Sequence, residues 1–387
     1  MNCKIGGDKL NYKRIGDYIS LVDERNAGHN VKNLLGLSIS KQFIPSVANI
    51  VGTDMENYKI IRRNQFACST MQVRRDKKMP VALLEEVDEA IISQAYPIFE
   101  VRDEKELLPE YLMMWFTRSE FDREACFHAV GGVRGSLEWE DFENLKLPIP
   151  HPDKQCEIVK EYNVIQNRIE LNQKLIQKLE ETAQAIYREW FVEGIDLENL
   201  PEGWRVGNLT NIATYLNGLA MQKFPAESEI YLPVLKIREL TQGYFDANSD
   251  KGSVDTPIEY VIENGDVIFS WSGTLKVDIW SGGKGALNQH LFKVYSKIYP
   301  KWYYYLWTKF HLSEFIRIAE GKATSLGHIK REHLIEAKVL IPTKDELDAK
   351  TNIMKPIFDN IELKQQENQK LTELKELLLS KLATIEN

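Results

Sequence analysis

The chain has 387 residues and a formal net charge of −8, from 49 Lys and Arg against 57 Asp and Glu. This length accommodates two or three domains, each with its own core. No signal peptide is recognised and no apolar run approaches the ~20 residues that cross a membrane, so we expect a cytoplasmic protein without membrane contact. The four cysteines form no CxxC pair, which argues against a zinc site and a disulfide framework.

Residues 1–146 form a mixed block in which expected strands alternate with turn-forming Gly, Pro, Asn and Asp. Its strand-like runs are "LLGLSIS" (34–40), "YKIIRRNQFAC" (58–68) and "AIISQAYPIFEV" (90–101). The stretch from Lys59 to Lys78 is strongly basic, with Asp76 as its single acid. A nucleic-acid face and an ordinary solvated loop both fit this charge pattern, and both interpretations stay open.

From Asp153 to Phe191 the chain lacks Gly and Pro, and its apolar residues alternate at spacings of four and three. This pattern predicts one coiled-coil helix of about 39 residues, roughly 60 Å long. Its expected seam residues are Ile158, Tyr162, Ile165, Ile169, Asn172, Ile176, Leu179, Ala183, Ile186 and Trp190. The following phrase "EGIDLENLPEGW" (193–204) is typical of a linker.

A second mixed block runs to about Lys338, and "VLIPTKDE" then opens a second helical stretch. Its expected seam residues are Ile357, Ile361, Leu371, Leu374, Leu378 and Leu382. Pro356 is expected to kink or interrupt this helix near its start, so that the helix runs mainly from there to the C-terminus.

The two halves of the chain repeat each other. "NRIELNQKLIQKLEE" from Asn167 aligns without a gap with "DNIELKQQENQKLTE" from Asp359. The mixed blocks align more weakly. "RNQFACST" (63–70) aligns with "NGDVIFSW" (264–271), and "ISQAYPIF" (92–99) aligns with "LNQHLFKV" (287–294). "PEYLMMWF…SEF" (109–121) aligns with "PKWYYYLW…SEF" (300–315), and the second copy has three extra residues. A repeat of half the chain is too long for a solenoid. We therefore predict modules at 1–146 and 194–338, with helical segments at 147–193 and 339–387.

No catalytic motif is recognised. "SGGKGA" (281–286) and "EGKATS" (320–325) lack the GxxxxGK[ST] spacing of a phosphate loop, and a plain turn explains both better. The seven histidines do not cluster at metal-ligand spacing. We expect a non-catalytic chain without a metal site, and an enzyme with an unrecognised site stays as an alternative.

Each half of the chain consists of a variable module that ends in "LPIP" or "VLIP" and a long helix that begins with acidic residues. This repeated arrangement resembles the specificity subunit of a Type I restriction-modification system. The second block adds "LPEGW", "YLPVLKIREL", "ENGDVIFSWSGT", "GALNQHLFKV" and "AEGKATSLGHIKREHL". The resemblance covers essentially the whole chain, although "VGGVRGSLEWEDF" in the first block is shorter than the corresponding loop. It implies an α+β protein with two pseudo-repeated α/β target-recognition domains, joined by two long antiparallel coiled-coil helices.

The resemblance also implies a function. Each target-recognition domain would read one half of a split sequence in double-stranded DNA, with the helices setting the distance between the halves. Two methyltransferase subunits and ATP-driven restriction or translocase subunits would bind this chain. Adenine methylation would occur on those partners after base flipping. S-adenosylmethionine, ATP and Mg would therefore be bound by the partners, and no cofactor is expected on this chain.

The candidate DNA-contacting residues lie in polar loops next to aromatic-rich strands. Asn and Gln pair with adenine and Arg and Lys with guanine, while hydroxyl and cationic groups suit phosphates. The candidates are Ser69, Thr70, Arg74, Arg75, Gln94 and Arg134 in the first module and Ser272, Thr274, Lys276, Asn288, Gln289, His290, Lys322 and Lys330 in the second. A further pair, Asn172 and Asn368, is predicted to fix the coiled-coil register.

Two alternatives of other kinds remain at this point. The acidic balance also fits a coiled-coil adaptor whose modules bind proteins instead of DNA. A specificity protein that serves a methyltransferase without any nuclease would have the same sequence features.

Overall fold

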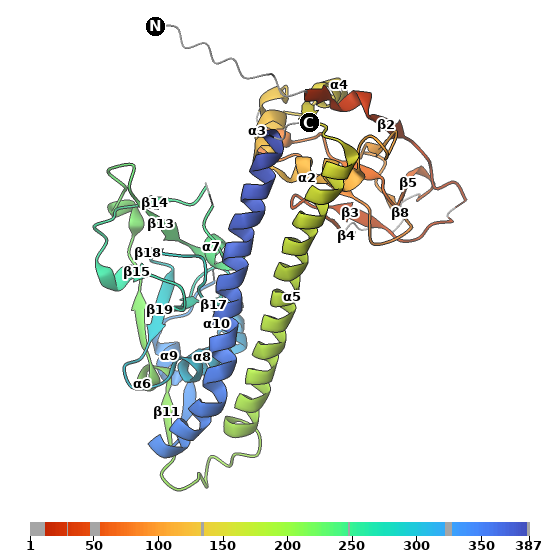
Figure 1. Cartoon of the computed structure of the whole chain (residues 1–387). Coiled ribbons are helices and arrows are strands. Elements are labelled where there is room, and N and C mark those ends of the chain that lie inside the picture. The colour runs from red at the N-terminus through yellow and green to blue at the C-terminus, as the bar shows by residue number, and fades with distance from the viewer. Residues whose placement is uncertain are drawn as a thin grey trace. The chain divides into compact units, whose positions relative to one another are not determined.

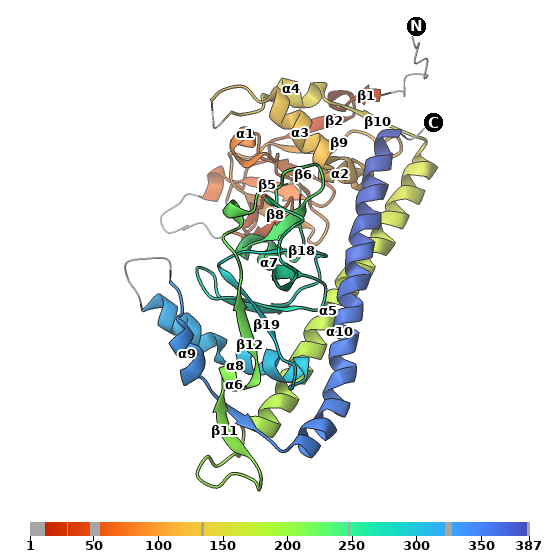
Figure 2. The same ribbon diagram turned by 90° about the vertical axis from the view of Figure 1, so that its left-hand side faces the viewer.

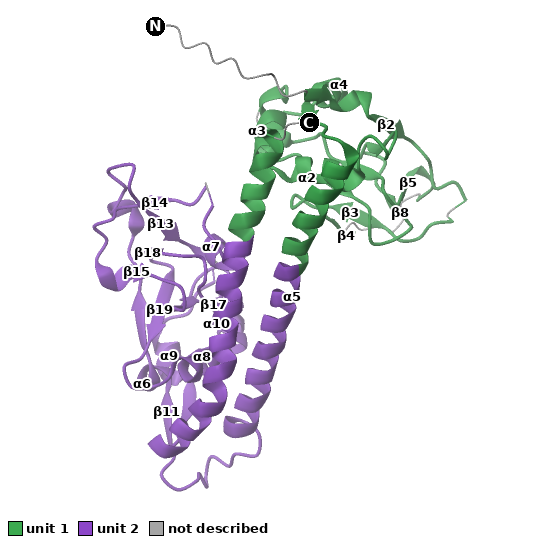
Figure 3. Cartoon of the chain, viewed as in Figure 1, with its two compact units in different colours: residues 1–167, 372–387 green, residues 168–371 purple. Residues whose placement is uncertain are grey.

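The computed structural model describes residues 12–28, 30–46, 55–132, 135–246, 248–321 and 327–384. The chain divides into two compact units: residues 1–167 together with 372–387, and residues 168–371 (Figure 3). Both boundaries fall inside long helices, α5 (Pro152–Phe191) and α10 (Lys344–Lys381), which are labelled in Figure 1. Each unit therefore contains one module and a segment of each helix, as the colours of Figure 3 show. Among the described residues, no helix is both long enough and apolar enough to span a bilayer.

The module of the first unit is built on a four-stranded antiparallel sheet in the order β2-β9-β6-β7. Its strands are β2 (Ile19–Val22), β6 (Phe66–Cys68), β7 (Val81–Leu83) and β9 (Ile98–Val101). Alternate side chains point to opposite faces. Phe66 and Phe99 join the main core with helices α2 (Pro109–Thr117) and α3 (Ser119–His128), whereas Ala67 packs in a second cluster. Burial on both faces explains why β6 and β7 are wholly apolar.

Three two-stranded antiparallel ladders complete this module: β1-β10, β3-β4 and β5-β8. Their strands are β1 (Tyr12–Arg14), β3 (Leu35–Leu37), β4 (Phe43–Pro45), β5 (Lys59–Arg62), β8 (Glu89–Ile92) and β10 (Lys146–Pro148). The short helices are α1 (Val73–Asp76), α4 (Trp139–Asn144) and the 3-10 turns Ile15–Asp17 and Met55–Asn57.

Each long strand predicted in this module is shorter in the structure. The run 58–68 divides into β5 and β6 because Asn64 adopts the left-handed conformation, with a φ of 65°. Asn tolerates this conformation better than most residues. The run 90–101 divides into β8 and β9 at a turn over 93–96, and only β3 forms within 34–40.

The module of the second unit has a four-stranded antiparallel sheet in the order β12-β19-β16-β17. Its strands are β12 (Thr214–Asn217), β16 (Val267–Ser270), β17 (Lys276–Ile279) and β19 (Leu291–Tyr295). A second sheet, in the order β14-β13-β18-β15, consists of β13 (Leu232–Leu235), β14 (Lys251–Gly252), β15 (Val261–Ile262) and β18 (Gly285–Leu287). A separate ladder pairs β11 (Arg205–Asn208) with β20 (Lys338–Ile341).

Helices flank the strands of this module (Figure 2). They are α6 (Leu209–Ile212), α7 (Ile237–Gln242), α8 (Lys301–Glu320) and α9 (Arg331–Glu336), with 3-10 turns at Met221–Lys223 and Ile258–Tyr260. Another 3-10 turn, Leu382–Thr384, follows α10 in the first unit. Apolar residues of β16, β17 and β19 pack with α8 and with α5 residues such as Ala183 in one core.

The strand registers confirm the repeat predicted from the sequence. In the central ladders Phe66 lies opposite Phe99, and Val267 lies opposite Val294, which are the residues that the sequence alignment equates. A second ladder repeats its register in the same way, with Ile60 opposite Ile91 in β5-β8 and Val261 opposite Ala286 in β15-β18. The two modules therefore share one scaffold.

The repeats differ where the second copy has its extra residues. In the first unit the chain between α2 and α3 is extended at Arg118, with φ −66° and ψ 141°, so two helices form. In the second unit the same region is the continuous helix α8. The extra residues fall between Trp307 and Ser313, so they lie within α8.

The seam predicted for the first long helix is confirmed, because every predicted seam position of α5 is buried or half-buried. In the second unit Asn172 Nδ2 donates to Asn368 Oδ1 at 2.9 Å. Further along α5, the Trp190 ring centre lies 4.8 Å from Lys350 Nζ of α10. Since higher residue numbers of α5 meet lower numbers of α10, the two helices are antiparallel there.

Two predictions for the second long helix are wrong: its interruption at Pro356 and the seam position of Leu374. The helix α10 begins at Lys344 and continues through Pro356. The proline is exposed and costs one backbone hydrogen bond without interrupting the helix. Leu374 is 49% exposed and does not lie in the seam. A strict alternation of four and three from Leu371 reaches Lys375 instead, which is half-buried.

We predict that the amide pair Asn172–Asn368 couples the two helices energetically. Replacing Asn172 by Leu removes the donor to Asn368 Oδ1, while Asn368 Nδ2 can still donate to the Ile169 carbonyl at 3.4 Å. We expect the free energy of unfolding to fall by about 1 kcal/mol. Replacing both residues by Leu removes both desolvated amides and should restore the wild-type value or exceed it. Urea unfolding followed by circular dichroism measures the complete cycle. Additive losses in the double variant would contradict the coupling.

Candidate nucleic-acid interface

Predicted residues of the second module meet where β16 ends and β19 begins. The Trp271 N–H donates to the His290 carbonyl at 3.3 Å, which joins the two segments through their backbones. Ser272 Oγ lies 3.0 Å from His290 Nδ1. The His290 N–H in turn donates to Asn288 Oδ1 at 3.3 Å. Three of the predicted residues, Ser272, Asn288 and His290, therefore form one hydrogen-bonded cluster.

A third segment, just before α9, reaches the same place. Ser272 forms an antiparallel bridge pair with His328, and the Gly273 N–H donates to the Gly327 carbonyl at 2.8 Å. This pairing brings Lys330, another predicted residue, to the same end of the module. Segments that are distant in the sequence thus converge on one surface.

An aromatic side chain that the sequence reasoning missed lies at the centre of this cluster. The ring centre of Trp271 is 6.0 Å from that of His290 and 6.3 Å from that of His328. The Trp271 Nε1–H donates to Asn217 Oδ1 at 2.8 Å. The phrase "SWSGT", with Trp between two Ser, was a signal for Trp271. No sequence signal pointed to Asn217, which comes from β12.

The predicted residues of this cluster differ in exposure. Ser272 is 9% exposed and Asn288 is 3% exposed, so their side chains hold the loops together. Thr274 and His290 are exposed, and Gln289 is half-buried with its Nε2 3.4 Å from His290 Nε2. The exposed groups are the ones accessible to a ligand.

Two of the lysines predicted to contact DNA in the second module, Lys276 and Lys330, lie in the described residues and have different environments. Lys276 Nζ donates to the Leu240 carbonyl at 3.1 Å and lies 2.8 Å from Asp278 Oδ2, so it is engaged within the module. Lys330 is exposed and lies 3.1 Å from Glu332 Oε1. Because an exposed ion pair of this kind contributes little, Lys330 can exchange its partner for a phosphate at small cost.

The first module places its predicted residues at the equivalent end of its sheet. Ser69 and Thr70 directly follow β6. The Ser69 N–H donates to the Pro80 carbonyl at 2.9 Å, and the Leu137 N–H donates to the Thr70 carbonyl at 2.9 Å. Gln94 is exposed in the turn between β8 and β9.

The two predicted arginines of the first module lie on α1. Arg74 Nη1 donates to the Gly131 carbonyl at 3.0 Å, which ties α1 to the loop before α4. Arg75 Nε donates to Asp76 Oδ1 at 2.6 Å. This hydrogen bond raises the pKa of Arg75 and lowers the pKa of Asp76, so both stay charged at neutral pH.

Both residues that flank α1 have left-handed backbones, Gln72 with a φ of 62° and Lys77 with a φ of 51°. A non-glycine residue in this region costs on the order of 1 kcal/mol, and such strain concentrates at functional sites. The surrounding structure therefore keeps the residues that flank α1 in a backbone conformation that they do not favour by themselves. The remaining two candidates, Arg134 and Lys322, lie outside the described residues.

The basic stretch of the first module divides into two parts. The cations of β5 and the following turn pair with carboxylates, as Lys59–Asp23 at 3.6 Å, Arg62–Glu24, and Arg63–Asp88 at 3.0 Å. Lys77 and Lys78, which follow α1, are exposed. Positive charge accessible to a ligand is thus concentrated around α1 instead of along the whole stretch.

Within the described ranges, no group of three or more His, Cys, Asp or Glu is placed to hold a metal ion. Cys68, Cys126 and Cys156 are free thiols, and Cys3 lies outside the described residues. Burial raises the pKa of the Cys68 thiol, so this group stays protonated and unreactive at neutral pH. The side chains that both modules present are hydroxyl, amide, imidazole and cationic groups, which suit recognition by hydrogen bonds and charge.

A model of the Type I restriction modification DNA specificity domain matches residues 73–181 and 201–373 of this chain. The MjaIX specificity subunit of a Type I restriction enzyme from Methanocaldococcus jannaschii is 23% identical over 305 residues, which cover 71% of this chain and 68% of that protein. The MjaVIII specificity subunit from the same organism is 22% identical over 268 residues. That match covers 63% of this chain and 62% of the relative, so the chain spans less than two thirds of it.

A solved structure has the same fold. The crystal structure of the S subunit of a Type I restriction-modification system from M. genitalium superposes with a TM-score of 0.54 at 14% sequence identity. The match covers 99% of this chain and 98% of that chain. It supports the two-module α+β architecture along the whole length.

We predict that glycine at position 218 is required for the chain to pass the Asn288 carbonyl. A Cβ on Gly218 would lie 2.3 Å from that oxygen, so the backbone would have to move. Gly218→Ala should therefore lower the free energy of unfolding by about 1 to 3 kcal/mol, measured by urea denaturation. Gly321→Ala is the matched control, because its Cβ would lie at least 3.5 Å from its neighbours. Equal losses in the two variants would contradict the role given to Gly218.

Proposed function

This chain belongs to the Type I restriction-modification DNA specificity family, and we propose that it reads one double-stranded DNA target in two halves, one with each module. DNA sequence recognition is the role that the family description names. The division of the target into two halves is our inference from the repeat. The chemistry would be carried out by partner subunits, with this chain deciding where on the DNA they act.

The observation that carries this proposal is that the modules share their strand registers but differ at the ends of equivalent strands. After β6 the first module has Ser69, Thr70 and the basic helix α1. After β16 the second module has Trp271, Ser272 and Thr274. A repeated scaffold with unlike ends suits the reading of two different short sequences, because framework positions recur while base contacts differ.

The exposed and half-buried groups of each module have the chemistry that such reading requires. In the second module we assign Gln289 and His290 to base edges, since an amide can pair bidentately with adenine in the major groove. Thr274 and Lys330 suit phosphates, which position the protein without selecting a sequence. In the first module the charged guanidinium groups of α1 suit guanine or phosphate, and Gln94 suits a base edge.

We also propose partners for the chain, which its membership of the family supports. Two methyltransferase subunits would bind the paired helices, and restriction or translocase subunits would join them for cleavage. S-adenosylmethionine, ATP and Mg would be held by those subunits. The target adenine would be flipped out of the stack before methyl transfer.

One observation favours a second candidate function. The net charge of −8 is unusual for a protein that binds phosphates on its own, and it fits an adaptor whose modules bind proteins. The two candidates differ in the salt dependence of DNA binding. A specificity subunit in its assembled complex must bind DNA less tightly as salt rises, whereas an adaptor has no such dependence.

The proposal is tested by mapping methylated adenines in host DNA by single-molecule sequencing, with the gene for this chain present and then deleted. We expect one split motif with a fixed gap to lose its methylation on deletion. An unchanged map beside an active methyltransferase would show that the chain directs something else. Loss of methylation without any restriction of foreign DNA in the parent would indicate a methyltransferase system that lacks the nuclease.

We predict that substitutions of residues assigned to bases and of residues assigned to phosphates have different effects on DNA binding. In the complex with its methyltransferase, Gln289→Ala should relax selectivity at one base pair of one half-target, worth about 1 to 3 kcal/mol. Lys330→Ala should weaken binding to all sequences alike and lower the salt slope by about 1. Quantitative binding to a set of single-base target variants at several salt concentrations measures both effects.

The control for this prediction is Lys297→Ala, an exposed lysine beyond the opposite end of β19. It carries the same charge change as Lys330→Ala and should leave both selectivity and salt slope at the wild-type values. If Lys297→Ala reduced binding as strongly as Lys330→Ala, a general charge effect would replace the assignment of Lys330 to a phosphate.

A further inference from the structure

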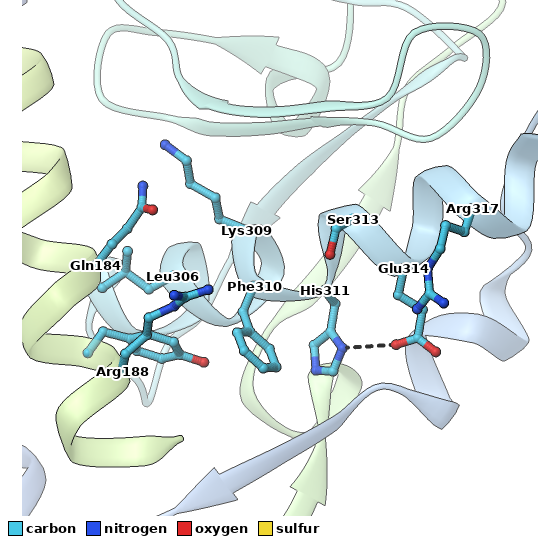
Figure 4. Close-up of a pocket in the computed structure, with 10 residues that line it drawn as sticks. Gln184, Arg188, Leu306, Lys309, Phe310, His311, Ser313, Glu314 and Arg317 are labelled. Atoms are coloured by element: carbon cyan, nitrogen blue, oxygen red, sulfur yellow. Dashed lines mark ion pairs between the residues drawn. The ribbon is translucent and has the colours of Figure 1, made fainter. Parts of the chain in front are cut away.

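A cavity of about 400 Å³ lies between α5 and α8 in the second unit (Figure 4). None of its lining residues belongs to the candidate nucleic-acid interface. From α5 come Gln184, Tyr187 and Arg188, and α8 supplies Lys309, Phe310 and Arg317 among others. The cavity combines cationic, polar and aromatic side chains, and neither the proposed DNA reading nor the helix seam uses it.

The positive charge of this cavity is only partly neutralised. Lys309 Nζ lies 2.9 Å from Glu180 Oε2 of α5. The acid in the lining, Glu314, lies 3.6 Å from His311 Nδ1, as the dashed line in Figure 4 marks. Arg188 and Arg317 are both exposed, and no hydrogen bond or ion pair from either guanidinium to another described residue is observed. Two permanent cations without a described partner therefore stand beside one carboxylate, Glu314, and the lining has a net positive charge.

A buried hydroxyl group in the lining also lacks a partner. Tyr187 is 2% exposed, yet its phenol oxygen makes no hydrogen bond to any described residue. Burial raises the pKa of Tyr187, so the group remains a donor. Buried donors are almost always satisfied, and an unsatisfied one costs roughly 1 to 3 kcal/mol. A ligand with an acceptor oxygen in the cavity would relieve this cost.

The cavity is lined in part by the region in which the second module is longer than the first. Lys309, Phe310 and His311 fall between Trp307 and Ser313, where the second copy is longer than the first. At the equivalent place of the first module the helix is broken at Arg118. Residues at positions that do not repeat can bind a ligand that the shared scaffold of the two modules does not bind. A ligand of this cavity would bind once per chain.

We propose that this cavity binds a short acidic segment of a partner polypeptide, with carboxylates on Arg188 and Arg317 and an apolar side chain against Phe310. Phe310 is 37% exposed and lies between Arg188 and Arg317 in Figure 4, so an apolar surface separates the two cations. Carboxylates accept bidentate hydrogen bonds from guanidinium groups and single bonds from a phenol. A DNA backbone supplies anions but no apolar side chain, and a duplex is too wide to enter a cavity of this size. The inference does not depend on DNA binding and goes beyond the proposed function.

The test uses the full-length chain and a fluorescein-labelled, acetylated peptide of sequence Asp-Glu-Phe-Glu-Asp, followed by fluorescence anisotropy. We expect one peptide to bind per chain and to weaken as salt rises, whereas the Asn-Gln-Phe-Gln-Asn peptide should not bind. Arg188→Glu with Arg317→Glu should reduce affinity at least about tenfold. Lys178→Glu with Lys355→Glu, an equal charge change at exposed sites on α5 and α10, should stay near the wild-type affinity.

A second variant separates ligand binding from folding. Tyr187→Phe removes only the unpartnered hydroxyl, so the free energy of unfolding should be unchanged or raised while peptide affinity falls about threefold or more. Binding no tighter than that of the amide peptide would overturn the proposal, as would equal losses in both double variants. Displacement of the peptide by a short DNA duplex, with the same dependence on Arg188 and Arg317, would assign the cavity to DNA and also overturn it.

Discussion

Each module is closed by an antiparallel ladder between its first and last strands, and the rest of the structure depends on this closure. Lys146 lies opposite Arg14 in β1-β10, and Lys338 lies opposite Asn208 in β11-β20. The ladder fixes the point at which the chain leaves the module, and a long helix, α5 or α10, begins a few residues later. Loops inside a module can therefore change without moving the start of the helix.

The elements that a local pattern specifies were predictable from the sequence. The spacing of four and three over Asp153–Phe191 identified α5, and the repeated phrases identified the shared scaffold. Boundaries set by single backbone angles were not predictable, as the break at Asn64 shows. Hydrophobicity alone also misplaced Leu374 in the seam, because the helical geometry selects Lys375, whose long aliphatic chain can fill an apolar position.

For the candidate site, only the types of residue and the loops that contain them were predictable from the sequence. Polar loops beside apolar strands indicated Ser272, Asn288 and His290, and the structure brings these together. Their division into buried supports and exposed reading groups depends on long-range strand pairing, which a single sequence does not display. The same limit explains why Asn217 was missed, whereas the phrase "SWSGT" did signal its partner Trp271. The family gives the chain a role in DNA recognition, and the geometry indicates which of the candidate side chains are accessible to a ligand.

The central claim, that each module reads its own half of the target, is tested most directly by a chain with the first module in both places. Residues 205–341, which run from β11 to β20, would be replaced by a second copy of residues 12–148, which run from β1 to β10. Methylated adenines would then be mapped in cells that contain the partner methyltransferase. The account predicts a new motif built from two copies of the first half-target. Methylation that retains the original second half-target would contradict it.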